Sequence, residues 1–133
     1  MTAAILDASA LLALILGEPG SDKVQSVLID CAMSVVNLGE VVGHFARIGS
    51  SEADIRAMLD PLPFLSVALD EELAFRTGLM LPTTRGAGLS FGDRACLALA
   101  DKLGVRALTA DRAWQRIGRA VGVEIELIRG ELH

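Results

Sequence analysis

Five short apolar runs, separated by segments of helical spacing, constrain the fold of this chain most strongly. Strands joined through helices must cross over, so this alternation favours a parallel sheet with helices on both faces. The sequence therefore predicts an α/β fold, a three-layer α/β/α sandwich around a mainly parallel five-stranded sheet. The predicted strands are residues 3–6, 33–36, 65–69, 106–109 and 124–128. The predicted helices are residues 9–16, 21–29, 38–48, 51–59, 71–80 and 91–103.

The length and composition fit one domain over residues 1–133. The 133 residues are 52% hydrophobic, enough to bury a core without disulfides or a structural metal. Cys31 and Cys96 lie far apart and outside any CxxC motif. We therefore expect both cysteines to be small core residues of a protein in a reducing compartment. Residues 80–90 are rich in Gly, Pro and Thr and predict an exposed loop.

The apolar N-terminal segment does not indicate a membrane protein, and the net charge alone does not indicate a nucleic-acid binder. Residues 8–16 are too short to span a bilayer and have no basic segment before them, so we expect a cytoplasmic protein. The net charge is −5, but residues 81–133 carry 8 basic and 6 acidic side chains. These later arginines are either scattered and solvated or part of a phosphate-binding surface. They are Arg85, Arg94, Arg106, Arg112, Arg116 and Arg119.

Two aspartates stand where predicted strands end. Asp7 closes the first apolar run, and Asp111 follows the fourth. In open α/β sheets, ligands bind outside the carboxyl ends of the strands, where the strand order reverses. The fourth strand is often the neighbour of the first across that point, so we expect both carboxylates to face one crevice.

Two further acids belong to the same predicted edge. Glu40 follows the second strand near a helix start, and Asp93 lies in the first turn of another helix. The alternative is that all four acids only cap helices, because Asn37 with Glu40 and Ser90 with Asp93 have capping-box spacing. Four converging anions would instead repel one another, and a divalent cation would relieve that repulsion.

The four acids in their sequence context resemble a known family. Asp7 lies in ILDASALLAL, Glu40 in SVVNLGEVV, Asp93 in GLSFGDRACLALA and Asp111 in LTADRAW. Their order, spacing and apolar flanks resemble the acidic quartet of PIN-domain nucleases, especially the VapC-type toxins of type II toxin-antitoxin systems. The resemblance runs from about residue 4 to the end of the chain.

The resemblance implies a PIN-like sandwich and a metal-dependent endoribonuclease in which Asp7, Glu40, Asp93 and Asp111 are catalytic residues and metal ligands. Carboxylate oxygens suit Mg²⁺ or Mn²⁺. We expect Asp7 and Asp93 as inner ligands, and Glu40 either as a ligand or as the group that orients the attacking water. Attack by water predicts products with a 5'-phosphate and a 3'-OH.

Polar side chains near the quartet are candidates for binding substrate. Ser9 and Thr109 would bond a ligand carboxylate or a phosphate, although Ser9 is equally a helix cap. Trp114 would stack on a base or, as its helical spacing from Ile117 favours, belong to the core. The arginines expected to meet the RNA backbone are Arg85, Arg94, Arg112 and Arg116.

The family resemblance also implies partners: a homodimer and a cognate VapB-type antitoxin that occupies a groove near the site. The apolar helical faces of residues 10–20 and 21–29 would line such a groove, or would simply pack in the core. We expect His44, one turn after Glu40, on the helix surface or facing a partner. Neither His44 nor His133 clusters with a cysteine in the sequence, so no zinc site is predicted.

Rival α/β functions lack their motifs here. A receiver domain would need an acidic pair after the first strand and a late lysine, but the only lysines are Lys23 and Lys102. A haloacid-dehalogenase-type phosphatase would need Asp-x-Asp, and a Rossmann domain its glycine fingerprint. A catalytically inactive interaction module that keeps the acids as caps stays open, and so does cleavage of DNA.

Overall fold

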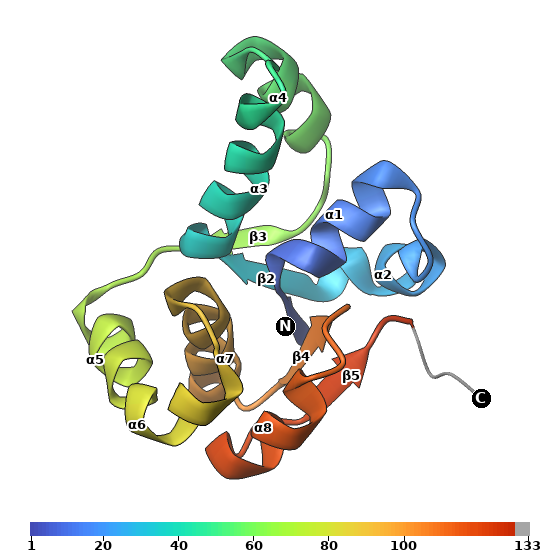
Figure 1. Ribbon diagram of the computed structural model, residues 1–133. Helices are drawn as coiled ribbons and strands as arrows, with labels where there is room; N and C mark the ends of the chain where they lie inside the picture. Colours follow the sequence, from blue (N-terminus) through green and yellow to red (C-terminus); the bar gives the residue numbers. More distant parts are fainter. Residues whose placement is uncertain (130–133) are drawn as a thin grey trace.

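The computed structural model describes residues 1–129 and has a five-stranded sheet between two layers of helices (Figure 1). Residues 130–133, which include His133 and the end of the predicted domain, lie outside the described residues. The strands are β1 (Ala4–Leu6), β2 (Cys31–Ser34), β3 (Leu65–Val67), β4 (Arg106–Thr109) and β5 (Ile125–Leu127). The α-helices are α1 (Ala8–Leu16), α2 (Ser21–Val27), α3 (Val35–Arg47), α4 (Glu52–Leu59), α5 (Glu71–Leu79), α6 (Leu81–Thr84), α7 (Phe91–Leu103) and α8 (Trp114–Val121). Short 3-10 turns are η1 (Leu28–Asp30) and η2 (Arg85–Ala87).

The sheet has the order β3-β2-β1-β4-β5, and its strand pairs are all parallel. This confirms the predicted α/β sandwich and sharpens "mainly parallel" to wholly parallel within residues 1–129. The strand order reverses at β1, which pairs with β2 on one side and with β4 on the other. The carboxyl ends of β1 and β4 therefore lie side by side, as the positions of Asp7 and Asp111 predicted.

Residues on each strand alternate between the two faces of the sheet because side chains in a strand have a period of two. Leu6, Met33 and Leu108 pack with α1 to α4 on one face. On the other face Ile5 and Ala107 pack with α5, α7 and α8. All of these residues of β1, β2 and β4 are buried, so both faces of the sheet are covered at its centre, whereas Leu65 on the edge strand β3 is exposed.

The second strand and the helix after it begin earlier than predicted. The predicted strand at 33–36 is β2 at residues 31–34, and α3 starts at Val35, three residues before the predicted 38. The reason is a cap: the Ser34 hydroxyl accepts a hydrogen bond from the Val36 amide at 3.2 Å. The alternative in which Asn37 and Glu40 form a capping box is therefore wrong. Asn37 lies inside α3 and is 1% exposed.

Residues 80–90 are not a simple exposed loop. They contain α6 and η2, and Thr84 is fully buried with its hydroxyl donating to the Met80 carbonyl at 2.9 Å. Trp114 is fully buried, which confirms the core alternative over base stacking. Among the described residues, no helix combines the length and hydropathy needed to cross a membrane.

Candidate active site

Asp7 is the buried centre of the candidate site. It follows β1 directly and caps α1, because its Oδ1 accepts a hydrogen bond from the Ala10 amide at 2.8 Å. Its side chain is held on both sides by hydroxyls: Ser9 Oγ donates to Oδ1 at 2.7 Å, and Thr109 Oγ1 donates to Oδ2 at 2.6 Å. Burial, together with a smaller effect of the charge of Asp93, raises the pKa of Asp7 to about 6, against the lowering effect of these hydrogen bonds.

Ser9 and Thr109 also anchor the chain that leads to Asp111. Ser9 Oγ accepts from the Ala110 amide at 2.9 Å, and Thr109 Oγ1 accepts from the Asp111 amide at 3.0 Å. A hydroxyl has one hydrogen, and both hydroxyls donate theirs to Asp7. The two side chains thus bond a carboxylate of the quartet, one of the two roles predicted for them, and fix the end of β4 to the end of β1.

Asp93 stands in the first turn of α7 and forms the predicted capping box. Its Oδ2 accepts from the Ser90 amide at 3.0 Å, and the Ser90 hydroxyl accepts from the Asp93 amide at 3.1 Å. The positive end of the helix dipole stabilises a carboxylate at this place. Asp93 also lies close enough to Asp7 for its charge to raise the Asp7 pKa. Capping and membership of an acidic cluster are therefore compatible here.

Glu40 reaches the cluster from the second turn of α3. Its Oε1 accepts a hydrogen bond from Asn37 Nδ2 at 2.9 Å, and the same nitrogen donates to the Gly92 carbonyl on α7 at 3.0 Å. The carboxylate lies so close to Gly92 that a β-carbon at that position would stand 2.2 Å from Oε2. Glu40 itself is exposed to solvent.

Three of the acids lie near the buried thiol of Cys96. Cys96 is fully buried, and burial raises its pKa well above the usual range. The charges of Asp7, Asp93 and Glu40 raise the Cys96 pKa further. The three carboxylates come from the end of β1, from α7 and from α3.

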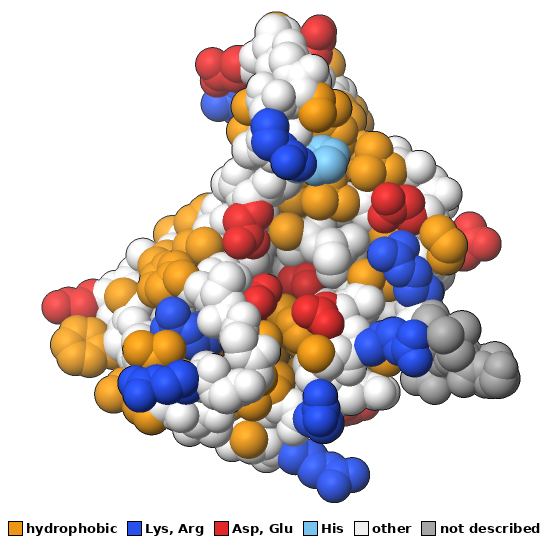
Figure 2. All heavy atoms as spheres, viewed as in Figure 1, with side chains coloured by type: hydrophobic (Ala, Val, Ile, Leu, Met, Phe, Trp, Pro, Cys, Tyr) orange, Lys and Arg blue, Asp and Glu red, His pale blue; other side chains and the backbone are white. Residues whose placement is uncertain are grey.

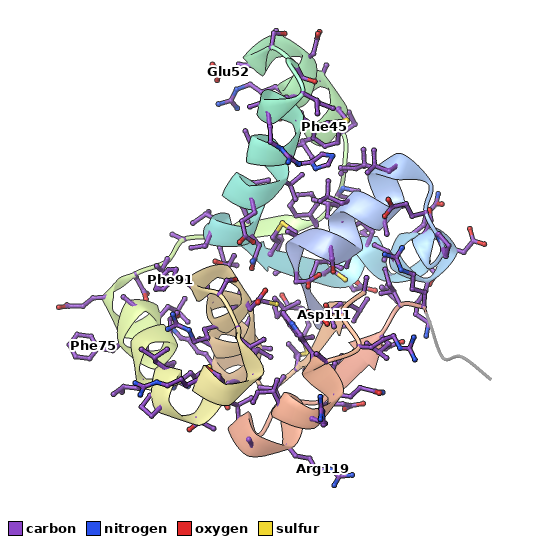
Figure 3. The ribbon with its side chains drawn as sticks, viewed as in Figure 1. Phe45, Glu52, Phe75, Phe91, Asp111 and Arg119 are labelled. Carbon is purple, nitrogen blue, oxygen red and sulfur yellow. The ribbon has the colours of Figure 1, made fainter. Side chains whose placement is uncertain are left out.

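Asp111, the fourth predicted acid, follows the end of β4 and is exposed. Its Oδ1 accepts from the Ala113 amide at 3.0 Å, so it caps a short turn before α8, which begins at Trp114. Figure 3 shows Asp111 near the centre of the molecule, where β4 leads toward α8. Its amide is tied to Asp7 through the Thr109 hydroxyl.

The four acids lack basic partners. None of the ion pairs within residues 1–129 includes a member of the quartet. Figure 2 shows acidic side chains grouped in a hollow at the centre of one face, with Lys and Arg side chains around its margins. As the side chains stand, no three acidic, His or Cys groups in the described part of the chain form a ready-made ligand set. Oxygen-only donors without a neutralising cation nevertheless fit a hard divalent ion in chemical type.

The predicted RNA-binding arginines differ in their surroundings. Arg94 donates from Nη1 to the Thr77 carbonyl at 3.0 Å, and its guanidinium lies over the Phe91 ring at 5.4 Å. To reach a phosphate it would have to leave these contacts. Arg85, Arg112 and Arg116 are exposed.

Two residues of the site were not predicted as parts of it: Asn37 and Gly92. Asn37 entered the sequence analysis only through its capping-box spacing to Glu40, whereas Cys31 and Cys96 are buried, as predicted for core cysteines. The sequence carries one signal that could have identified Asn37, since an asparagine three residues before a glutamate inside a helix places both side chains on one face. Nothing in the sequence shows that Gly92 faces Glu40, because that contact joins separate helices.

Comparison with known proteins shows the family of the chain. A family model for the PIN domain matches residues 4–120. A search of curated proteins finds no match. Among solved structures, a chain of the DNA-bound VapBC of Salmonella typhimurium is similar at a TM-score of 0.74 and 17% identity, over 97% of this chain and 100% of that one.

Two further solved structures share the fold. VapBC2 of Rickettsia felis, bound to a DNA fragment from its promoter, gives a TM-score of 0.73 at 14% identity, over 95% of this chain and 98% of that one. VapBC-5 of Mycobacterium tuberculosis, described as a member of the VapBC family of toxin-antitoxin systems, gives 0.60 at 20% identity, over 98% and 100%. At these identities the likeness concerns the fold.

Proposed function

This chain belongs to the PIN-domain family, and from that premise we propose that it is a Mg²⁺- or Mn²⁺-dependent endoribonuclease, a VapC-type toxin that a cognate antitoxin neutralises. One observation carries the proposal. Hydrogen bonds join the segments that carry the four acids: Thr109 bonds both Asp7 and the Asp111 amide, and Asn37 bonds both Glu40 and the Gly92 carbonyl next to Asp93. No cation of the described chain pairs with any of these acids.

The quartet supplies the ligands. Asp7 and Asp93 are the proposed inner ligands, because hydrogen bonds from the protein already fix both carboxylates. Within residues 1–129, Asp7 Oδ2 accepts a hydrogen bond from Thr109 alone, which leaves a lone pair for a cation. When bound, the divalent ion lowers the pKa of a coordinated water and stabilises charge on the departing phosphate oxygen. Glu40, exposed and held at one oxygen, is the proposed group that orients the attacking water.

The substrate proposed is RNA, cut by water in line with the departing oxygen. Since the ribose 2'-OH is not the nucleophile, the products carry a 5'-phosphate and a 3'-OH. Arg85, Arg112 and Arg116 are the exposed arginines proposed to meet the backbone, with Arg94 where it leaves Thr77. Their positive charge offsets the repulsion between an acidic centre and phosphates.

The proposed partners are an antitoxin of the VapB type and a second copy of the chain. A groove of about 550 Å³ lies between α1, α2 and α4, with Leu14, Ile15 and Leu28 in its wall. An apolar segment of the antitoxin would bind in this groove, which is lined in part by residues 10–20 and 21–29, the two segments that the sequence indicated. Phe75 and Leu79 on α5 are 64% and 73% exposed, and they support an apolar contact between protomers. Figure 3 shows Phe75 pointing away from the body of the molecule.

The test is cleavage of a small-RNA pool by antitoxin-free protein, with Mg²⁺ or Mn²⁺ against EDTA. Asp7→Asn is expected to abolish metal-dependent cleavage. Asp70→Asn is the matched control, because Asp70 caps α5 as Asp7 caps α1, with Oδ1 accepting from the Leu73 amide at 2.9 Å. Asparagine is an equally good cap, so both variants should fold.

Cuts with 5'-phosphate ends that persist in Asp70→Asn and vanish in Asp7→Asn would support the nuclease. Products ending in a 2',3'-cyclic phosphate would rule out attack by water. No cleavage in either metal, together with no metal-induced rise in melting temperature, would favour an interaction module in which the acids are only caps.

A further inference from the structure

Glu40 is the one acid of the quartet whose position helix capping does not explain. Asp7, Asp93 and Asp111 each accept a backbone amide hydrogen near a chain turn, whereas Glu40 lies inside α3 and its recorded hydrogen bond comes from a side chain. A long, exposed glutamate on a helix would otherwise sample several rotamers. Something else must hold its carboxylate in the cluster.

Asn37 is the first part of that device. Its Nδ2 donates both to Glu40 Oε1 at 2.9 Å and to the Gly92 carbonyl at 3.0 Å. Two acceptors at the same nitrogen fix which way the amide faces. The amide oxygen is energetically unfavourable there, because Asn37 Oδ1 is buried and has no hydrogen-bond partner among residues 1–129. An unpaired buried acceptor costs about 1–3 kcal/mol, so Asn37 is a poor choice for stability alone.

Gly92 is the second part. It lies in the first turn of α7 without a positive φ, so its backbone does not require glycine. Glycine within a helix costs roughly 0.5–1 kcal/mol relative to alanine. A β-carbon there would stand 2.2 Å from Glu40 Oε2 and 2.8 Å from Oε1. The Glu40 carboxylate therefore occupies the space that a side chain at position 92 would fill.

We propose that Asn37 and Gly92 are positioning residues: the Asn37 amide and the open face of Gly92 hold the Glu40 carboxylate against the first turn of α7, beside Asp93. The inference rests on the proposed function and deepens it, because the position of Glu40 then sets the affinity of the acidic cluster for its divalent cation. Groups that orient a metal site without binding the metal typically change the affinity by about 10–100-fold.

Gly92→Ala separates positioning from folding. The obstructing atoms are the far end of a flexible side chain, so the backbone can stay while Glu40 moves. Gly43→Ala is the matched control, because Gly43 lies on the same helix as Glu40 and a β-carbon there meets nothing within 4 Å. Both metal-free variants are expected to melt at or above the wild-type temperature.

The deciding measurement is calorimetric titration of Mn²⁺ into the metal-free proteins. Gly92→Ala is expected to bind Mn²⁺ about tenfold more weakly than wild type, and Gly43→Ala as tightly as wild type. In a Glu40→Gln background, Gly92→Ala should cause no further loss, because it acts through Glu40. Asn37→Leu should weaken Mn²⁺ binding in the same direction.

The outcomes distinguish the two proposals. Wild-type binding of Mn²⁺ that Gly92→Ala leaves unchanged overturns the positioning role alone. A further tenfold loss from Gly92→Ala in the Glu40→Gln background also overturns it, since the effect would not pass through Glu40. A wild-type protein that does not bind Mn²⁺ overturns the proposed function, and the inference with it.

Discussion

Thr109 Oγ1 donates a hydrogen bond of 2.6 Å to Asp7 Oδ2, joining residues 102 positions apart in the chain. The bond crosses from the end of β4 to the end of β1, where the strand order of the sheet reverses. This hydrogen bond lowers the pKa of Asp7, against the effect of burial, which raises it. The Thr109 hydroxyl oxygen also accepts a hydrogen bond from the Asp111 amide at 3.0 Å. One hydroxyl therefore orients Asp7 and places the segment that carries Asp111.

Thr109→Val tests that double role, because valine keeps the shape and removes the hydroxyl. Losing these hydrogen bonds in a buried place should cost about 1–3 kcal/mol of unfolding free energy and weaken Mn²⁺ binding. Thr77→Val is the control: Thr77 is equally buried, and its hydroxyl donates to the Leu73 carbonyl at 2.7 Å, on α5. Denaturant unfolding and Mn²⁺ titration should show both variants destabilised and only Thr109→Val impaired in metal binding. Equal Mn²⁺ affinities in the two variants would contradict this role.

The raised pKa of Asp7 predicts how stability depends on pH without metal. Burial shifts this pKa from 3.8 to about 6, so the folded state binds the proton more tightly than the unfolded state. The resulting stabilisation is complete below pH 3.8 and is lost as pH rises through about 6. At pH 8 the buried carboxylate then costs roughly 3 kcal/mol relative to its protonated form.

Asp7→Asn removes that titration. In EDTA the variant should equal wild type near pH 4 and exceed its stability by up to about 3 kcal/mol at pH 8. Urea unfolding at several pH values measures the difference. Adding Mg²⁺ at pH 8 should stabilise wild type and not Asp7→Asn. A difference that stays constant from pH 4 to pH 8 would show that Asp7 does not titrate in this range.

The sequence predicted what depends on neighbouring positions along the chain. Strand ends at Asp7 and Asp111, the Ser90–Asp93 capping box and the burial of Trp114 all follow from local spacing, and the structure confirms them. The start of α3 was wrong because Val35 and Val36 look like strand residues, whereas the Ser34 cap decides the boundary. Such choices depend on one hydrogen bond.

Contacts between distant elements account for the features that the sequence did not predict. Asn37 was interpreted from its spacing to Glu40, but its second acceptor is the carbonyl of Gly92, 55 positions away. Arg94 could be recognised as basic, yet its contact with the Thr77 carbonyl depends on how α5 packs against α7. Residue types and local spacing do not contain this information.

Ser90→Ala and Asp93→Asn separate capping from catalysis at the start of α7. Ser90→Ala removes the acceptor for the Asp93 amide and should cost about 1 kcal/mol of stability while RNA cleavage is kept. Asp93→Asn keeps an oxygen for the cap but removes the charge, so cleavage and Mn²⁺ binding should fall at little cost in stability. Melting temperature and cleavage rate, measured together, check both variants. Comparable losses of cleavage in the two would mean that Asp93 acts only as a cap.

Arg112→Ala tests the proposed contact with the RNA backbone. Arg112 is exposed, and each phosphate that an arginine neutralises on a single strand contributes about 0.7 to the slope of log affinity against log salt. Arg56→Ala is the control, because Arg56 is exposed on α4 and paired with Glu52, so both variants lose one positive charge. Binding of a cleavable RNA is measured in the Asp7→Asn background, from low to moderate salt. Arg112→Ala should weaken binding and flatten the slope by about 0.7, and Arg56→Ala should do neither. An identical slope in the two variants would remove Arg112 from the RNA interface.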